Sequence, residues 1–139
     1  MEYTTLGRTG LKVSRLGLGG GGIAQMFGAT TRDEAIRTVQ RALELGINFF
    51  DACYCYGDGE AETVLGLALE GRRDEAIICS KVDFRPWVLD DTDGFVDGWI
   101  DAALKRLRTD VIDVLLVHNQ FTSVRNEEPY SLTVQDVLG

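Results

Sequence analysis

The sequence is poor in basic clusters, long apolar runs and cysteine, and each shortage argues against a class of protein. Its 14 Lys and Arg residues are outnumbered by 22 Asp and Glu residues, so the net charge is −8. Nucleic acids and anionic membranes are not expected partners, because phosphate binding needs concentrated positive charge. No stretch approaches the roughly 18 consecutive apolar residues of a membrane span, and the first 15 residues contain no apolar signal segment. Three cysteines do not make a disulfide framework, so we expect a cytoplasmic protein.

The hydrophobic pattern alternates between short strands and amphipathic helices. A hairpin is predicted around residues 7–10, and the apolar segment after it runs into four consecutive glycines, 19–22. Thr31 and Glu34 have the spacing of a capping box, and Gly46 is placed to end the helix that they begin. The pattern also predicts helices at residues 60–71 and 95–107, and strands at residues 47–50, 76–80 and 111–117.

The predicted strands are continuous apolar runs, which are typical of a parallel sheet covered by helices. Their order fits either an open doubly wound sheet or a (β/α) barrel. The length of 139 residues suits a single domain. In both architectures, functional groups collect at the carboxyl ends of the strands.

Three of these strands deliver ionisable residues of complementary types. Asp51, Lys81 and His118 each follow an apolar run. Desolvating a lysine is costly unless an anion pairs with it, so Asp51 is expected to pair with Lys81. Tyr56 can loop back to Lys81, where a cation lowers the pKa of a phenol. With His118 to orient a carbonyl oxygen, this set suits carbonyl reduction or alcohol oxidation, and the hydride must come from a redox cofactor.

Three long stretches carry ordered motifs: "YTTLGRTGLKVSRLGLGGG", "GINFFDACYCYGDGEAETVLGLAL" and "LKRLRTDVIDVLLVH". They resemble the aldo-keto reductases, a family of NAD(P)H-dependent (β/α)8-barrel oxidoreductases. Carried onto this sequence, the family's catalytic tetrad falls on Asp51, Tyr56, Lys81 and His118. The resemblance implies that Tyr56 is the general acid and that Lys81 lowers its pKa. It also implies that Asp51 holds Lys81 and that His118 orients the substrate carbonyl. Tyr54 is the rival acid, but the family spacing favours Tyr56.

The resemblance also implies ligands. The expected cofactor is NADP(H) or NAD(H), and the expected substrate is a small aldehyde, ketone or sugar. Cofactor contacts are predicted at Gly20, Gly21 and Asp51, and substrate contacts at Tyr56, Trp87, His118 and Asn119. For the glycine run, close backbone approach to a ligand competes with a flexible turn. For Trp87, a pocket wall competes with an apolar loop anchor.

The length of the chain leaves two functions open. A complete (β/α)8 barrel needs roughly 250 residues, so residues 1–139 correspond to about the N-terminal half of one such domain. The resemblance implies that the second half carries most of the cofactor site. The chain is then either an NAD(P)H-dependent oxidoreductase or a catalytically incompetent half-barrel, a fragment or interaction subunit. A half-barrel has unpaired sheet edges and needs a second copy or another chain to cover them.

The alternation of cysteine and tyrosine at residues 53–56 raises the separate question of a metal or redox site. Beyond Cys53 and Cys55, only Cys79 and His118 remain as sulfur or nitrogen ligands. Cysteines at i and i+2 on a strand-like stretch point to opposite sides. The sequence therefore predicts thiols that fill space near a strand end, and no metal site.

Overall fold

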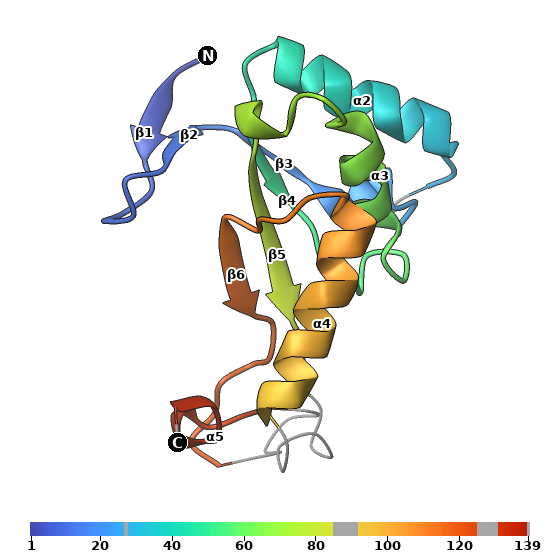
Figure 1. The fold of residues 1–139 in the computed structure, drawn as a ribbon. Helices are drawn as coiled ribbons and strands as arrows, with labels where there is room; N and C mark the ends of the chain where they lie inside the picture. The colour runs from blue at the N-terminus through green and yellow to red at the C-terminus, as the bar shows by residue number, and fades with distance from the viewer. Residues whose placement is uncertain (27, 85–91, 125–130, 139) are drawn as a thin grey trace.

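The computed structural model describes residues 1–26, 28–84, 92–124 and 131–138, which form a small hairpin and a helix-covered sheet (Figure 1). The hairpin pairs β1 (Tyr3–Thr5) with β2 (Lys12–Ser14) in antiparallel register. It lies to one side of the larger sheet (Figure 1). The predicted hairpin is confirmed.

The larger sheet has four parallel strands in the order in which they occur in the sequence. These strands are β3 (Gly17–Gly19), β4 (Phe49–Asp51), β5 (Ile77–Val82) and β6 (Val114–Val117). Gly19 pairs with Asp51, which pairs with Cys79, so the carboxyl ends of the first two strands are level. A doubly wound sheet reverses its strand order, whereas a barrel keeps it. The observed order is therefore that of the first strands of a barrel.

Helices alternate with the strands of the larger sheet along the chain. They are α1 (Gly20–Ile23), α2 (Arg32–Glu44), α3 (Glu60–Ala68), α4 (Thr92–Leu107) and α5 (Val134–Leu138), with a short 3₁₀ turn at Arg73–Glu75. The helices α2, α3 and α4 lie along one side of the sheet (Figure 1). Within the described residues, every helix is too short or too polar to cross a bilayer.

Both ends of α2 form as the sequence predicts. The hydroxyl of Thr31 accepts a hydrogen bond from the backbone N–H of Glu34 at 3.2 Å, and the Glu34 carboxylate accepts one from the Thr31 N–H at 2.8 Å. At the other end Gly46 has φ +85°, a left-handed conformation that glycine adopts without strain. The N–H of Ile47 then bonds to the carbonyl of Ala42 at 3.0 Å, which closes the helix.

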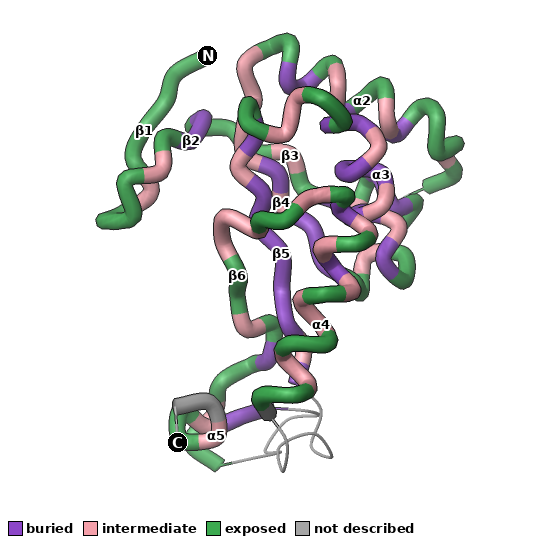
Figure 2. The backbone as a smooth tube through the Cα atoms, viewed as in Figure 1, coloured by how far each residue is buried: buried purple, intermediate pink, exposed green. Residues whose placement is uncertain are grey.

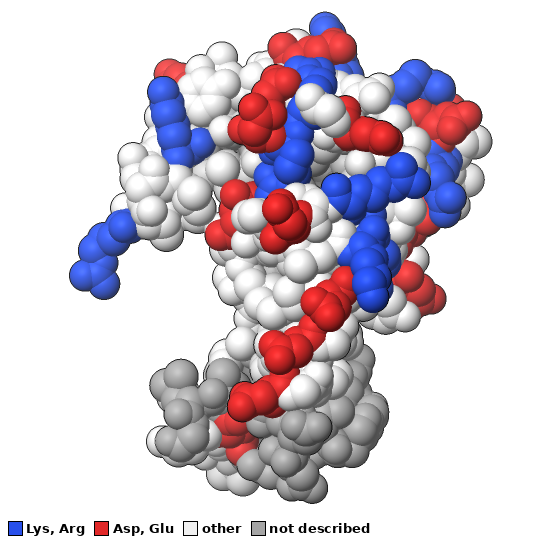
Figure 3. Space-filling view, in the orientation of Figure 1, with Lys and Arg blue, Asp and Glu red and all other residues white. Residues whose placement is uncertain are grey.

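The hydrophobic core lies between the sheet and the helices α2 and α3. Phe50 of β4 and Ile78 of β5 are fully buried there, against Val39 of α2 and Val64 of α3. The strand β5 is buried over nearly its whole length, whereas β6 is half-buried or exposed (Figure 2). Acidic side chains line the outer side of α4 (Figure 3), which is a solvated face.

The predicted boundaries of the strands need correction, and those of α3 and α4 also differ, since α3 ends at Ala68 and α4 begins at Thr92. The strand β4 begins at Phe49, because Asn48 instead ties the hairpin down: its side chain accepts a hydrogen bond from Ser14 N–H at 2.6 Å. The strand β6 begins at Val114, because the Asp113 carboxylate accepts the N–H of Ile78 at 2.8 Å. Lys81 lies inside β5, which continues to Val82.

Candidate functional site

Three neighbouring strands bring Asp51, Lys81 and His118 to the carboxyl edge of the sheet, as predicted. Asp51 is the last residue of β4, and Lys81 is the penultimate residue of β5. His118 directly follows β6, and its backbone N–H bonds to the carbonyl of Val82 at 2.8 Å. The strand order therefore places a carboxylate, an ammonium group and an imidazole at one edge of the sheet.

The ammonium group of Lys81 is held by β4. Its Nζ lies 2.6 Å from Asp51 Oδ1 and 2.9 Å from the carbonyl oxygen of Ala52. The lysine side chain is 10% exposed. Burial alone lowers the pKa of Lys81, but hydrogen bonding and charge from Asp51, with a further contribution from Tyr56, raise it above its usual value. Lys81 is therefore a fixed cation at neutral pH, and its predicted pairing with Asp51 is observed.

Tyr56 folds back over the strand ends to meet this pair. Its hydroxyl is 3.5 Å from Asp51 Oδ2, and Lys81 Nζ lies 4.8 Å from the centre of its ring. The ring of His118 stands nearly perpendicular to the Tyr56 ring, at 89° and 6.5 Å between centroids. The four predicted residues thus form one cluster, in which an exposed histidine and a half-buried phenol surround a buried cation.

The reversal of the chain at Tyr56 depends on small residues. Gly57 and Gly59 have φ +68° and +90°, so the segment after β4 turns instead of continuing the strand. Gly20 of α1 packs under the tyrosine: a Cβ there would lie 2.6 Å from the Asp51 carbonyl oxygen and 3.3 Å from Tyr56 Cδ2. A glycine at residue 20 is what lets α1 approach the site.

A small hollow of about 230 Å³ opens beside the cluster. It is lined by Gly19, Gly20, Gly21, Gly22, Met26, Asp51 and Tyr56. The residues predicted to contact the cofactor, Gly20, Gly21 and Asp51, therefore lie around one cavity. Met26 was not predicted, because it belongs to an irregular segment with no pattern to mark it. Gly20, Gly21 and Gly22 are helical and form most of α1, so the glycine run is not simply a flexible turn.

The other two predicted substrate contacts are Asn119 and Trp87. The side chain of Asn119 is bound on both sides by the backbone of Phe84, whose N–H it accepts and whose carbonyl it donates to, each at 2.8 Å. Asn119 thus holds the segment that leaves β5. Trp87 lies outside the described residues.

The two cysteines near the site do not point apart, as the strand-like pattern predicts. The strand β4 ends at Asp51, and Cys53 and Cys55 lie in the turn that follows. Their sulfur atoms are 2.6 Å apart, and each lies 3.7 Å from Nδ1 of His118. Burial, together with the Cys55 hydrogen bond, raises the pKa of the Cys53 thiol to about 12. The prediction that the cysteines face opposite sides is wrong, because the residues are in a turn.

A buried ion pair between Glu62 and Arg106 supports the strand that carries Lys81, and the sequence patterns did not predict it. Glu62 of α3 is fully buried, and its carboxylate accepts hydrogen bonds from Arg106 Nε at 2.6 Å and from the Ser80 hydroxyl at 2.7 Å. It ties α3 to α4 and to the residue before Lys81. The sequence does carry a signal: Glu62 falls three residues before Leu65, on the apolar side of its helix.

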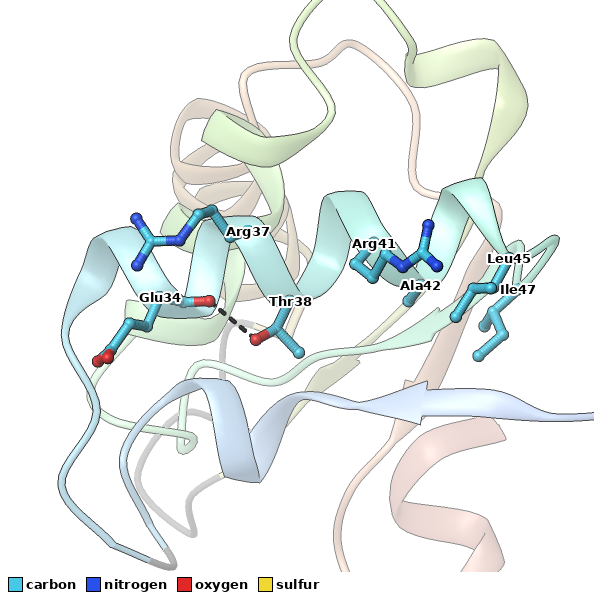
Figure 4. Close-up of a pocket in the computed structure, with 7 residues that line it drawn as sticks. All are labelled: Glu34, Arg37, Thr38, Arg41, Ala42, Leu45 and Ile47. Carbon is cyan, nitrogen blue, oxygen red and sulfur yellow. Dashed lines mark hydrogen bonds between the residues drawn. The ribbon is translucent and has the colours of Figure 1, made fainter.

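A second, larger hollow holds none of the predicted site residues. It measures about 490 Å³ and lies along the outer side of α2, between Glu34 and Ile47 (Figure 4). The hydroxyl of Thr38 points along the helix and donates to the Glu34 carbonyl at 2.8 Å (Figure 4). Size alone therefore does not identify the candidate site; the convergence of ionisable groups does.

Comparisons of sequence and of structure with known proteins point to the same family. Residues 15–135 match the sequence model of the Aldo/keto reductase family. L-galactose dehydrogenase of Arabidopsis thaliana is 38% identical over 122 residues, which cover 86% of this chain and 38% of that protein. A solved aldo-keto reductase from Bacillus halodurans, in its holo form, has a TM-score of 0.71 and 31% identity, over 86% of this chain and 40% of that one. One from Klebsiella pneumoniae, in complex with NADPH, has a TM-score of 0.68 and 27% identity, over 84% and 38%. The chain thus spans 38–40% of the length of these relatives.

Proposed function

Because this chain belongs to the aldo/keto reductase family and forms about the first half of its barrel, we propose that the protein interconverts a carbonyl and an alcohol. The proposed general acid is Tyr56, and the proposed cofactor is NADP(H) or NAD(H). The observation that carries this proposal is the cluster of Tyr56 with Lys81 and Asp51, in which the phenol oxygen lies 3.5 Å from the carboxylate of an ion pair. The substrate class is a small aldehyde, ketone or sugar.

The residues of the cluster have distinct roles in this reaction. Tyr56 donates its hydroxyl proton to the carbonyl oxygen as that oxygen gains negative charge. The cation of Lys81, 4.8 Å from the ring, stabilises the charge left on the tyrosine oxygen. Asp51 fixes the position of Lys81, and His118, exposed beside Tyr56, orients the carbonyl by a hydrogen bond.

The hollow beside Tyr56 fits the reacting end of a dinucleotide. Four of its lining residues are glycines, so backbone forms one wall and no side chain fills the space. Among the described residues that line the hollow, none is Lys or Arg, the side chains that bind phosphate groups. The N-terminus of α1 does line it, but this helix has only four residues and offers little of the dipole that binds phosphate at longer helices. We therefore assign Gly20, Gly21 and Asp51 to the nicotinamide end and leave the phosphates to the remainder of the barrel. The cofactor, when bound, supplies the hydride.

The experiment that tests the acid is a pair of tyrosine variants. In a preparation that reduces a carbonyl substrate with NADPH, Tyr56→Phe should lower kcat by roughly 10²–10⁴-fold, the usual contribution of a positioned proton donor. Tyr54→Phe is the matched control, because Tyr54 is two residues away and packs against Trp99 instead. Equal turnover by the Tyr56→Phe variant and the wild type would remove the acid role.

A second candidate function rests on the exposed residues of β6. Leu115 and Leu116 are 39% and 45% exposed although they belong to a strand of the sheet. Neighbouring apolar residues that face solvent are typical of a surface that another polypeptide covers. The chain would then act as a half-barrel subunit completed by a second copy or another chain, without catalysis of its own.

Titration of the 139-residue chain with NADPH, combined with its mass in solution, separates the two functions. A half-barrel subunit should bind NADPH weakly and should associate through β6, and Leu116→Asp should shift it toward the monomer. Tight NADPH binding by a monomer would rule out this second candidate.

A further inference from the structure

We propose that Cys53, Cys55 and His118 form a binding site for a thiophilic divalent cation such as Zn²⁺. The three side chains come from two segments that are far apart in the sequence, the turn after β4 and the residue after β6. One ligand atom from each, Sγ, Sγ and Nδ1, lies within 4.8 Å of the other two. Two thiolates and one imidazole are a donor set that zinc uses when it keeps a coordination position open.

The two distances from His118 Nδ1 to the sulfur atoms already match those between the ligands of a tetrahedral zinc ion. With zinc–sulfur bonds of about 2.3 Å and zinc–nitrogen bonds of about 2.0–2.1 Å, sulfur and nitrogen ligands lie about 3.5 Å apart. The observed separation of His118 Nδ1 from each sulfur is 3.7 Å. The histidine is therefore placed correctly for both thiols at once.

The distance between the two sulfur atoms does not match zinc coordination, so one cysteine side chain must move. Two sulfurs on a tetrahedral zinc lie about 3.8 Å apart, whereas those of Cys53 and Cys55 are 2.6 Å apart. Cys53 is fully buried, but Cys55 is exposed. Rotation of the Cys55 side chain therefore opens the site without repacking the core. Exposure of Cys55 and His118 also gives the ion a path from solvent.

Occupation of the site has a consequence for His118. A neutral imidazole that ligates through Nδ1 carries its proton on Nε2. The ion thus fixes the ring and leaves Nε2–H as a hydrogen-bond donor. This consequence rests on the proposed role of His118 in orienting the carbonyl, whereas the cation site itself does not depend on any activity.

Cobalt binding to the reduced chain tests the site directly. Co²⁺ replaces Zn²⁺ in tetrahedral sites and reports thiolate ligands by a charge-transfer absorption band. The metal-free 139-residue chain, kept reduced and without oxygen, should bind one Co²⁺, develop this band, and lose it when Zn²⁺ is added. Loss of an outer partner of a metal ligand already costs about 10–100-fold in affinity. Cys55→Ser and His118→Gln, which remove direct ligands, should therefore each cost at least about 100-fold.

Cys79→Ala is the matched control, because Cys79 is the only cysteine of the sequence outside the cluster. It should bind Co²⁺ as the wild type does. Absence of the charge-transfer band in the wild type, or an equal loss in Cys79→Ala, would overturn the proposal. So would unchanged binding by His118→Gln, or recovery of the chain only as a Cys53–Cys55 disulfide that binds no metal. Because Cys55 and His118 are exposed, both variants are expected to fold, and circular dichroism verifies this.

Discussion

Lys81 Nζ lies 2.6 Å from Asp51 Oδ1, and this ion pair joins the two central strands of the sheet at their carboxyl ends. The pair is unequal: the lysine side chain is 10% exposed and the aspartate side chain 34%. Solvent therefore stabilises the aspartate directly, while the lysine depends on the aspartate for its charge. Any change that removes the charge of Asp51 is therefore expected to lower the pKa of Lys81.

Asp51→Asn should destabilise the chain by about 1.5–3 kcal/mol, the usual worth of a hydrogen bond to a charged group. The reason is that the buried ammonium of Lys81 then loses its charged partner Asp51, while it keeps the neutral Ala52 carbonyl. Urea unfolding at pH 7 measures the effect. A variant as stable as the wild type would show that the pair is merely a surface contact.

The same pair should give the stability a pH dependence at the alkaline end. The pKa of Lys81 is raised in the folded chain by Asp51, against the lowering effect of burial. Its contribution is therefore complete below the unfolded value of about 10.4, and is lost as the pH rises through the higher folded value. The difference in unfolding free energy between wild type and Lys81→Met should be equal at pH 7 and pH 9 and shrink above about pH 10.4. Lys105→Met, at an exposed lysine, should show no such trend.

Arg106→Met should destabilise the chain by about 3–5 kcal/mol, because it leaves the carboxylate of Glu62 buried without its charged partner. Among the described residues, Glu62 keeps only the Ser80 hydroxyl as a partner in that variant. Arg108→Met is the control: the Arg108–Glu70 pair is exposed, with side-chain exposures of 51% and 72%, and 3.3 Å long. Exposed pairs contribute about 0–1 kcal/mol, so similar losses in the two variants would contradict this account.

Gly20→Ala should cost about 1–3 kcal/mol, the range for overpacking. Its new Cβ would lie 2.6 Å from the Asp51 carbonyl oxygen and 3.0 Å from Ala61 Cβ. Gly22→Ala, in the same short helix, meets nothing within 4 Å and should be neutral or slightly stabilising. Thermal unfolding of the two variants, compared with the wild type, gives the ranking, and the reverse order would show that α1 does not pack as described.

Alkylation by iodoacetamide at pH 8 should modify Cys55 alone. Cys55 is exposed, whereas Cys53 and Cys79 are buried. Burial and the charge of Asp51 raise the pKa of Cys79 to about 11, and that of Cys53 is about 12, so both remain unreactive thiols at this pH. Peptide mapping by mass spectrometry identifies the adducts. In urea, all three cysteines should react, and rapid labelling of Cys79 in the folded chain would contradict the buried position.

Much of the site was predictable because it depends on strand order. An apolar strand followed by an ionisable residue can be recognised locally, and parallel strands bring such residues to a common edge. Asp51, Lys81 and His118 were found in this way, and their proximity follows from the in-order sheet. Their chemical roles remain predictions. The hydrogen bonds of Asn119 to the Phe84 backbone could not be predicted in this way, because they join segments 35 residues apart, and its predicted substrate contact stays a prediction.

The sequence by itself determined the elements whose signals are local: the capping box at Thr31, the left-handed Gly46, and the apolar strands that end at ionisable residues. Only the tertiary structure decided how the turn after Asp51 runs. The pattern of alternating Cys and Tyr reads as a strand, yet the chain turns there, with the Tyr56 N–H bonded to the Cys53 carbonyl at 3.0 Å. Both sulfurs then lie near His118, and Tyr56 lies near Lys81. The partners in those contacts are 25 to 65 residues apart. Contacts at that separation depend on the packing of the whole sheet, which no local pattern encodes.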